Sequence, residues 1–352
     1  MHRSLTPTPG SPAALGYRMP AEWEPHAATW LAWPHKSASW PGKLERIPPI
    51  WVEMVRALVV GETVNILVNE SAPAAEVRSC LKRAGVPLQR VQLHDVPTDD
   101  AWIRDHGPMF VTGPAGALAI VDWKYNAWGG KYPPWDQDDH VPRAIAQRLA
   151  VEAYSPGIVM EGGSIDVDGR GTLLTTEACL LNPNRNPELG REEIEQHLCD
   201  YLGVRRVLWL GDGIAGDDTD GHVDDLTRFV APGVVVTVLE DDPEEVNFAP
   251  LQENYRRLQA LRDAGGRALR IVPLLMPEPI FYEDARLPAS YANFYIGNAA
   301  VLVPIFGSPR DAGALATLRM LFPGRAVVGI NAVDLVWGLG AFHCVTQQQP
   351  AV

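Results

Sequence analysis

A cysteine near the end of the chain is the residue whose type and surroundings most clearly suggest chemistry. Cys344 directly follows His343, comes after the glycines Gly338 and Gly340, and precedes three glutamines. Structural thiols usually lie inside apolar runs, so a thiol between a glycine-rich stretch and a polar run is a candidate nucleophile. A catalytic cysteine needs a base and charged partners from elsewhere in the chain.

Three segments supply such partners. Each places carboxylates beside glycines just before an apolar stretch that is typical of a β-hairpin. They are residues 98–108 with Asp105, residues 160–169 with Glu161, and residues 217–225 with His222 and Asp224. His222 and Asp224 are two residues apart, so both side chains project from one face if residues 221–229 are extended. We therefore expect a base and several anions near the ends of strands.

This set of side chains suits a cationic substrate. Carboxylates bind the planar guanidinium group through pairs of N–H···O contacts. Resonance makes the central guanidinium carbon a poor electrophile, so the site must hold the charge and also present a strong nucleophile. The sequence therefore predicts chemistry on a guanidino compound.

The same segments resemble the agmatine deiminase family of the guanidine-modifying superfamily, which is related to bacterial peptidylarginine deiminases. The likeness also covers residues 123–130, 173–177, 182–187 and 290–295, and it extends over nearly the whole chain from Met19 onward. The resemblance implies an α/β fold, a five-bladed pseudo-symmetric propeller of ββαβ-type repeats, with the site on its central axis.

The resemblance also implies a role for each of the five chemical residues. Cys344 would attack the guanidinium carbon and form a thiouronium intermediate, while His222 would protonate the departing ammonia and then activate water. Glu161 would hold His222 in its charged or correctly oriented form, and Asp105 and Asp224 would bind the guanidinium nitrogens. The implied reaction is hydrolysis of a C–N bond: agmatine becomes N-carbamoylputrescine and ammonia, in putrescine biosynthesis, without metal or cofactor.

Two tryptophans flank the acidic and glycine motifs. Trp102 is the better candidate to bind substrate, by walling an apolar slot or stacking on the guanidinium, and Trp128 is the second. The other tryptophans, including Trp51, Trp209 and Trp337, are expected in the core or at interfaces.

Two stretches depart from the family pattern. Leu339, Ala341 and Phe342 replace the usual Gly, Asn and Ile before the nucleophile, and Asp166 stands where His is usual. The five chemical residues are unchanged, so the departures concern the pocket for the far end of the substrate.

Other activities fit the same side chains. A free-arginine deiminase would need a cation for the α-carboxylate, for which Lys124 and Lys131 are candidates, and a peptidylarginine deiminase would need an open rim. An amidinotransferase would pass the amidino group to an amine instead of water. A non-catalytic module that binds polyamines or guanidino compounds would keep the carboxylates and could dispense with Cys344.

Each motif also has a structural interpretation. Cys344 could be a core thiol, and Asp105 could pair with Arg104 or cap a helix. Residues 212–225 are acidic enough for a solvated loop or a calcium site, although the EF-hand spacing fails at the glycine and at the terminal glutamate. The histidines show no paired spacing for zinc.

Composition narrows the class of protein. The chain carries 43 acidic and 30 basic side chains and a net charge of −13, which disfavours nucleic acids and anionic membranes and favours a small cationic ligand. No apolar run approaches the roughly 18 residues that span a bilayer. Four scattered cysteines indicate a reducing cytoplasm, and Cys80, Cys179 and Cys199 are expected to be structural thiols. Assembly into a homo-oligomer is left open.

Periodicity predicts a repetitive α/β domain. Residues 1–17 are expected to form a mobile tail, and residues 18–352 a single catalytic domain. Four hairpins are predicted within residues 109–121, 164–175, 226–239 and 294–305, and amphipathic helices within residues 49–60, 140–151, 188–202, 244–264 and 310–322. A fifth hairpin would pair residues 29–33 with residues 342–345 and so join the two ends of the chain.

Overall fold

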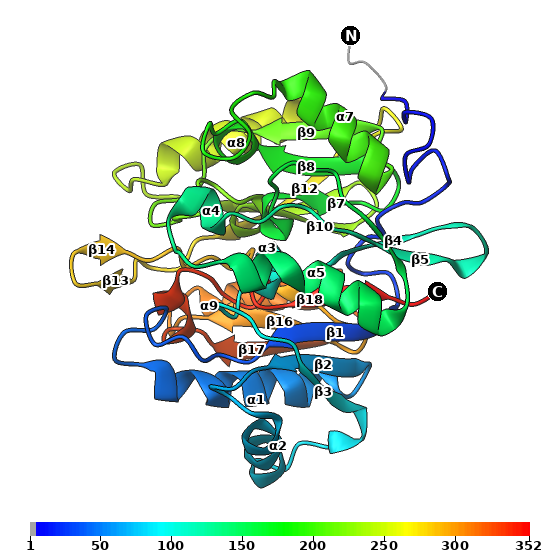
Figure 1. Cartoon of the computed structure of the whole chain (residues 1–352). Coiled ribbons are helices and arrows are strands. Elements are labelled where there is room, and N and C mark those ends of the chain that lie inside the picture. Colours follow the sequence, from blue (N-terminus) through cyan, green and yellow to red (C-terminus); the bar gives the residue numbers. More distant parts are fainter. Residues whose placement is uncertain (1–4) are drawn as a thin grey trace.

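The chain folds into a mixed α/β structure made of several small sheets, seen in a computed structural model that describes residues 5–352 (Figure 1). Among these residues, five sheets have three or four strands each. A sixth is a two-stranded hairpin of β13 (Phe281–Tyr282) and β14 (Ala285–Arg286).

Four of the sheets repeat one arrangement. An antiparallel pair of strands is followed by a helix and then by a third strand that is parallel to the second. The third strand is parallel because the helix crosses over the sheet and returns the chain to the end at which the second strand began. The strands are β4 (Met109–Thr112), β5 (Leu118–Val121) and β6 (Glu152–Tyr154); β7 (Asp166–Val167), β8 (Thr172–Thr176) and β9 (Arg206–Leu210); β10 (Thr227–Ala231), β11 (Val234–Leu239) and β12 (Arg270–Leu275); and β15 (Tyr295–Ile296), β16 (Ala300–Ile305) and β17 (Ala326–Asn331). The crossover helices are α5 (Asp136–Leu149), α7 (Arg191–Leu202), α8 (Phe248–Ala260) and α9 (Asp311–Leu321).

The fifth large sheet joins the two ends of the chain. Its order is β18-β1-β2-β3, with β18 antiparallel to β1 and the other pairs parallel. The strands are β1 (His26–Ala32), β2 (Thr63–Val68), β3 (Val91–Asp95) and β18 (Gln347–Pro350), and the crossovers are α1 (Ile47–Leu58) and α2 (Ala74–Arg83). The predicted partner of residues 29–33 was therefore wrong by a few residues, since pairing begins at Gln347 and residues 342–345 form a turn.

The glutamine run explains this shift. The Gln347 amide donates to the Pro108 carbonyl at 2.7 Å, and the Gln349 amide oxygen accepts the indole N–H of Trp30 at 2.9 Å. These contacts attach the two glutamine side chains to neighbouring segments, so a polar sequence forms the strand.

The four other predicted hairpins are confirmed, and each predicted helix has its counterpart. The expected extension of residues 221–229 is wrong, because Val223–Asp225 form a 3-10 turn, η5, and β10 begins only at Thr227. One carboxylate oxygen of Asp217 accepts the backbone N–H groups of Gly221 and His222, both at 3.0 Å, and so curls the chain before the strand.

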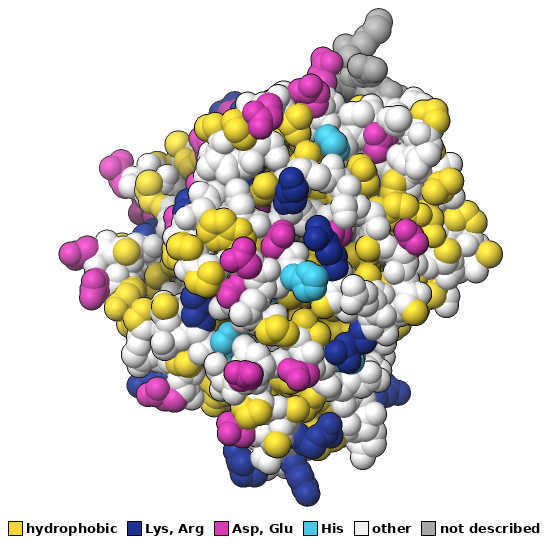
Figure 2. All heavy atoms as spheres, viewed as in Figure 1, with side chains coloured by type: hydrophobic (Ala, Val, Ile, Leu, Met, Phe, Trp, Pro, Cys, Tyr) yellow, Lys and Arg dark blue, Asp and Glu magenta, His cyan; other side chains and the backbone are white. Residues whose placement is uncertain are grey.

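Helices cover the outside of the sheets. In Figure 1, α1 and α2 lie at the bottom and α7 and α8 at the top, with strands between them. The apolar side of α1 carries the fully buried Trp51, which belongs to the same hydrophobic core as Val64 and Ile66 of β2. Within residues 5–352 no helix is long and apolar enough to cross a membrane. Lys and Arg are interspersed with Asp and Glu on the face shown in Figure 2.

Part of the predicted mobile tail can be placed. Residues 1–4 lie outside the described residues. Residues 5–17 contact α7, where Asp200 accepts the backbone N–H of Thr8 at 2.6 Å and Gln196 donates to the Thr6 carbonyl at 3.0 Å. The mobility of this segment stays a prediction.

Candidate active site

The candidate site is built from the turns that precede the five antiparallel strand pairs. A short turn just before a strand can turn a side chain inward while the strand fixes its backbone. The contributors are Asp105 on α3 (Ile103–His106) before β4, Glu161 beside η4 (Gly162–Ser164) before β7, His222 and Asp224 at η5 before β10, Asn293 before β15, and His343 and Cys344 before β18.

Hydrogen bonds join neighbouring turns to one another. Side chains are the acceptors or donors in most of these contacts, so the turns that hold the chemical groups also hold each other. The contacts are Gly163 N–H to Asp105 at 2.9 Å, Phe229 N–H to Asp166 at 2.9 Å, Asn293 Nδ2 to Asp225 at 3.0 Å, His343 N–H to Asn293 at 3.0 Å and Arg104 N–H to the Cys344 carbonyl at 3.1 Å.

The structure brings the five predicted chemical residues together. The Cys344 Sγ lies 3.8 Å from Asp224 Oδ2. His222 Nδ1 lies 3.7 Å from Asp105 Oδ1 and 4.0 Å from Asp224 Oδ1, and its Nε2 lies 3.9 Å from Glu161 Oε2. None of the five is more than 5% exposed. A thiol, an imidazole and three carboxylates therefore share one buried site.

Several polar atoms of this site have no hydrogen-bond partner. They are Asp224 Oδ1, both ring nitrogens of His222 and Glu161 Oε2, all buried. Buried polar atoms are nearly always paired, so a cluster of unpaired ones indicates that a ligand completes the contacts. Because the unpaired Asp224 Oδ1 is an acceptor, the ligand group that completes its contacts is a hydrogen-bond donor.

Gly163 keeps this space open. A Cβ atom there would lie 2.6 Å from His222 Nδ1, 2.8 Å from Asp105 Oδ1 and 2.9 Å from Asp224 Oδ2. These distances are too short for any larger residue, so glycine lets the two carboxylates and the imidazole approach one another.

The imidazole of His222 is charged. Burial disfavours its cation, but Asp105, Cys179 and Glu161 outweigh that effect and hold the pKa of His222 well above its ordinary value. Burial also opposes ionisation of Glu161, yet the Arg185 guanidinium, 2.5 Å away, and His222 keep the pKa of Glu161 below its ordinary value. An imidazolium held by a carboxylate can act as a general acid.

The protein surroundings disfavour the thiolate form of Cys344. Burial and the nearby Asp224, Asp225 and Asp105 raise the pKa of Cys344 well above its ordinary value. Burial, followed by the charges of Asp224 and Glu161, also raises the pKa of Asp105 to about 6, although His222 opposes this. A cation placed among these acids would favour both the thiolate and the carboxylate.

His343 connects the site to a buried network of charges. Its Nδ1 lies 2.6 Å from Asp224 Oδ2 and its Nε2 lies 2.8 Å from Glu22 Oε2. Each ring nitrogen thus contacts a carboxylate oxygen, so His343 bridges the two acids. Burial opposes ionisation of Asp224, but His343, His222 and Arg228 outweigh burial and lower the pKa of Asp224.

Two arginines complete this network. Arg228 lies 2.9 Å from both Glu22 and Asp166, and Arg104 lies 3.4 Å from Glu22. Three acids, Asp224, Glu22 and Asp166, therefore face three cations. Asp166, which departs from the family pattern, is the partner of Arg228.

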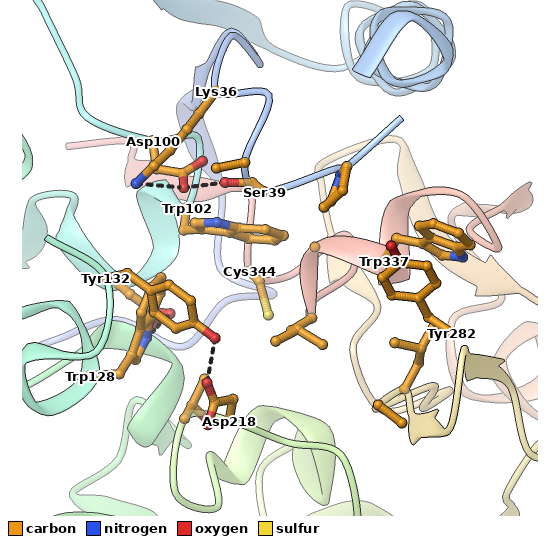
Figure 3. A pocket seen from close by; sticks show the side chains of 18 residues that line it. Lys36, Ser39, Asp100, Trp102, Trp128, Tyr132, Asp218, Tyr282, Trp337 and Cys344 are labelled. Atoms are coloured by element: carbon orange, nitrogen blue, oxygen red, sulfur yellow. Dashed lines mark hydrogen bonds and ion pairs between the residues drawn. The ribbon is translucent and has the colours of Figure 1, made fainter. Parts of the chain in front are cut away.

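A cavity of about 320 Å³ leads to Cys344 and Asp105 (Figure 3). Trp102 lines it and packs on Trp40 with ring centroids 5.3 Å apart, and its contact with substrate stays a prediction. Trp128 also lines it and donates its indole N–H to Asp105 Oδ2 at 3.0 Å. Trp337, expected in the core, is instead part of the wall, where it stacks on Tyr282 at 3.9 Å.

The outer part of the cavity carries two acids. Asp218 accepts hydrogen bonds from the Tyr132 hydroxyl and from Lys131, and Asp100 lies 3.5 Å from the ammonium of Lys36. Lys36 lines the cavity, whereas Lys124 and Lys131, the cations that the sequence suggested, do not.

Leu339 also lines the cavity and has a left-handed backbone, with φ of +70°. Glycine adopts this conformation without strain, which explains why a glycine is usual here. The other two departures, Ala341 and Phe342, are buried.

Asp217 stabilises the acidic loop that precedes His222. Both oxygens of Asp217 accept hydrogen bonds from the loop itself, including the backbone N–H of Thr219 at 2.8 Å. Among the described residues, the group with the donor set for a metal ion is a different one, Glu161, Cys179 and His222.

Several contact residues were missed by the sequence interpretation. Asn293 Nδ2 donates to Cys344 Sγ at 3.1 Å, and Arg185 binds Glu161. Both lie in stretches that resemble the family, which was the available signal. Glu22 gave no signal, because its function as a counter-ion depends on residues more than 80 positions away in the chain.

Comparison with known proteins places the chain among deiminases. The family model described as Porphyromonas-type peptidyl-arginine deiminase matches residues 18–350. The chain is 40% identical over 370 residues to an agmatine deiminase of Stutzerimonas stutzeri, covering 99% of each chain. The solved agmatine deiminase of Enterococcus faecalis matches with a TM-score of 0.90 and 37% identity over 100% of both chains. A substrate-bound C. jejuni agmatine deiminase matches at 0.86 and 29% identity, over 95% of this chain and 96% of that one.

The buried network generates a stability prediction. Arg228→Met should lower the free energy of unfolding by about 3–5 kcal/mol, because Glu22 and Asp166 would remain buried without their cation. Arg256→Met removes an exposed pair with Glu253 and should cost about 1 kcal/mol or less. Urea unfolding of both variants measures the difference, and equal losses would contradict a structural function for the network.

Proposed function

The chain belongs to the Porphyromonas-type peptidyl-arginine deiminase family, and from this premise we propose that it is an agmatine deiminase, which hydrolyses agmatine to N-carbamoylputrescine and ammonia. One observation carries the proposal. A buried thiol, Cys344, lies 3.8 Å from Asp224 in a site where Asp224 and His222 have unpaired polar atoms that a guanidinium and its leaving amine can satisfy.

Asp105 and Asp224 bind the guanidinium. Their carboxylates accept its N–H groups, and Trp128 and Gly163 orient Asp105 by donating to its two oxygens. His343 orients Asp224 from the opposite side. The planar group is thereby fixed with its central carbon in front of Cys344.

Binding also activates the nucleophile. Burial and nearby acids raise the pKa of Cys344, and the incoming cation offsets the charge of those acids, so the thiol releases its proton to water as the guanidinium enters. The thiolate then attacks the guanidinium carbon and forms a C–S bond. His222, held by Glu161, gives a proton to one NH₂ group, and the C–N bond breaks to release ammonia.

The same groups then hydrolyse the thiouronium, with His222 acting as a base instead of an acid. His222, now neutral, takes a proton from a water molecule whose oxygen attacks the same carbon. The C–S bond then breaks, so Cys344 is regenerated and the product is a urea. Asn293, which donates to the Cys344 sulfur, stabilises negative charge on sulfur in both steps.

The cavity favours agmatine over arginine. Its aromatic and aliphatic walls suit the methylene chain, and Asp218 in its outer part can attract the free ammonium. The α-carboxylate of arginine would enter a site rich in acids. The one lysine that lines the cavity, Lys36, already lies near Asp100.

We also infer the finer architecture and setting. Five repeated strand–helix units, joined end to end by β18 and β1, support a five-bladed pseudo-symmetric propeller, with residues 18–352 as one catalytic domain. Four unpaired cysteines support a cytoplasmic location. A homo-oligomer is compatible with this proposal.

The first prediction concerns the nucleophile. Cys344→Ser should lower kcat for agmatine at least about a thousandfold, because an unactivated hydroxyl is a much poorer nucleophile than a thiolate. Cys80→Ser, on α2, is the matched control and should keep its rate. Ammonia release measures both, and near-normal turnover by Cys344→Ser would refute the mechanism.

The second prediction concerns pH. Because Asp105 must be ionised to bind the cation and its pKa is raised to about 6, kcat/KM should rise as pH increases from about 5 to 7. In the enzyme–substrate complex the guanidinium favours the ionised form of Asp105. The rise of kcat with pH should therefore occur at lower pH than the rise of kcat/KM. A kcat/KM that is flat over this range would contradict the assignment.

The third prediction concerns substrate choice. kcat/KM should be higher for agmatine than for free arginine or a blocked arginyl peptide. Asp218→Asn should reduce kcat/KM for agmatine by up to about tenfold but leave butylguanidine, which lacks the ammonium, nearly unchanged. A wild-type preference for arginine or for the peptide would overturn the substrate assignment and leave the deiminase chemistry standing.

A further inference from the structure

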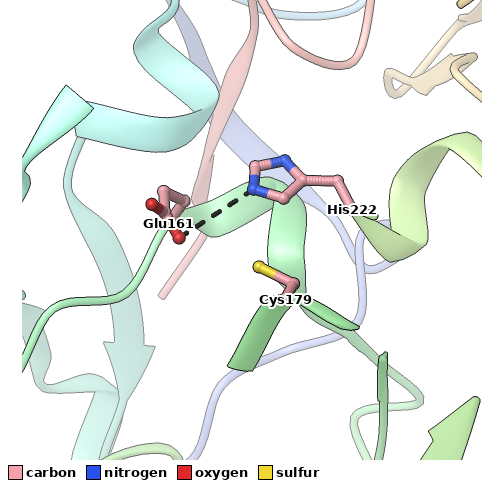
Figure 4. Close-up of side chains that lie close together, drawn as sticks. All are labelled: Glu161, Cys179 and His222. Carbon is pink, nitrogen blue, oxygen red and sulfur yellow. Dashed lines mark ion pairs between the residues drawn. The ribbon is translucent and has the colours of Figure 1, made fainter. Parts of the chain in front are cut away.

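A second thiol lies beside the imidazole of the active site. Cys179 is on the short helix α6 (Glu177–Leu180), and its Sγ, Glu161 carboxylate oxygen and His222 ring nitrogen all lie within 4.8 Å of one another (Figure 4). The proposed reaction uses Glu161 and His222 but gives Cys179 no function.

The local backbone holds Cys179 in this place. The Thr176 hydroxyl accepts the backbone N–H of Cys179 at 3.2 Å and donates to the Gly221 carbonyl at 2.6 Å. The start of α6 is thereby tied to the residue that precedes His222. The thiol and the imidazole are consequently held together by one hydroxyl group.

The unpaired polar atoms of the cluster also lie close together. All three residues are 0% exposed, and Glu161 Oε2 and His222 Nε2 have no hydrogen-bond partner. These two atoms are 3.9 Å apart. Ligand atoms of a tetrahedral zinc site lie roughly 3.4 Å apart, given bonds of about 2.0–2.3 Å, so small side-chain rotations would bring the three donors to a common ion.

The donor set selects the kind of ion. A thiolate, an imidazole and a carboxylate suit Zn²⁺ or Co²⁺, whereas Mg²⁺ and Ca²⁺ prefer oxygen ligands alone. Asp105, 3.7 Å from His222, adds negative charge beside the cluster. Arg185, bound to the other oxygen of Glu161, opposes a cation and limits the affinity.

We propose that Glu161, Cys179 and His222 form an inhibitory site for zinc-like ions. Binding forms Zn–S, Zn–N and Zn–O bonds and displaces the protons of Cys179 and His222 to water. The ion removes His222 from proton transfer, so the enzyme stops until the metal is chelated. The inhibition rests on the proposed deiminase function, whereas the binding itself does not.

The first test measures binding without activity. Cobalt(II) is titrated into Cys344→Ala protein, in which the other nearby thiol is absent, and thiolate-to-cobalt charge-transfer absorption is recorded. We expect the band to saturate at one cobalt per chain, to disappear when Cys179→Ala is added, and to persist when Cys80→Ala is added instead. No band in Cys344→Ala, or a band that survives Cys179→Ala, would overturn the site.

The second test measures inhibition. Each protein is compared with its own rate in metal-free buffer. Zinc should inhibit the wild type and the Cys80→Ala control, and a chelator should restore the rate. Cys179→Ala should need at least about tenfold more zinc. Equal sensitivity of Cys179→Ala would refute the proposal, whereas cobalt binding without any agmatine turnover would refute only the deiminase function.

Discussion

The burial of several carboxylates around one thiol is the constraint on which the rest of the site depends. Asp105, Glu161 and Asp224 are at most 5% exposed, and each lies within 4.0 Å of the His222 ring, so their repulsion must be offset by protein cations instead of water. Arg185 is the partner of Glu161, and His343 is the partner of Asp224. Glu22, the next acid in the same network, is paired with Arg228 and Arg104. For Asp105, burial raises the pKa and outweighs the opposing effect of His222, 3.7 Å away, while Asp224 and Glu161 act in the same direction as burial.

The charges of the three carboxylates are offset to different degrees, and this difference affects the reactivity of Cys344. Burial and the nearby acids raise the pKa of Cys344, and in the proposed mechanism a guanidinium supplies positive charge beside the thiol. The substrate thereby completes both the hydrogen bonding and the electrostatics of the site. In the proposed mechanism the nucleophile is activated only when its target carbon is in place, and this limits reaction of the thiol with other electrophiles.

Much of this arrangement could be predicted from the sequence, and the limits have physical causes. Turn chemistry and periodicity located the hairpins and the helices, and the position of Cys344 in a glycine-rich segment singled it out. The extended geometry assumed for residues 221–229 was wrong, because Asp217 curls the backbone through hydrogen bonds that no periodicity encodes. The strand at residues 347–350 was missed because its glutamines look solvent-exposed, whereas their partners, the Trp30 indole and the Pro108 carbonyl, are distant in the chain. His343 illustrates the same limit: its two acidic partners come from positions 22 and 224.

The measurement that tests the account most directly is mass spectrometry of the protein quenched with acid during agmatine turnover. A covalent mechanism predicts a fraction of chains heavier by the mass of agmatine less that of ammonia, with the added mass on the peptide that contains Cys344. Cys344→Ala should show no such species. Steady turnover with no adduct at any time, or an adduct on Cys179 or another residue, would contradict the account.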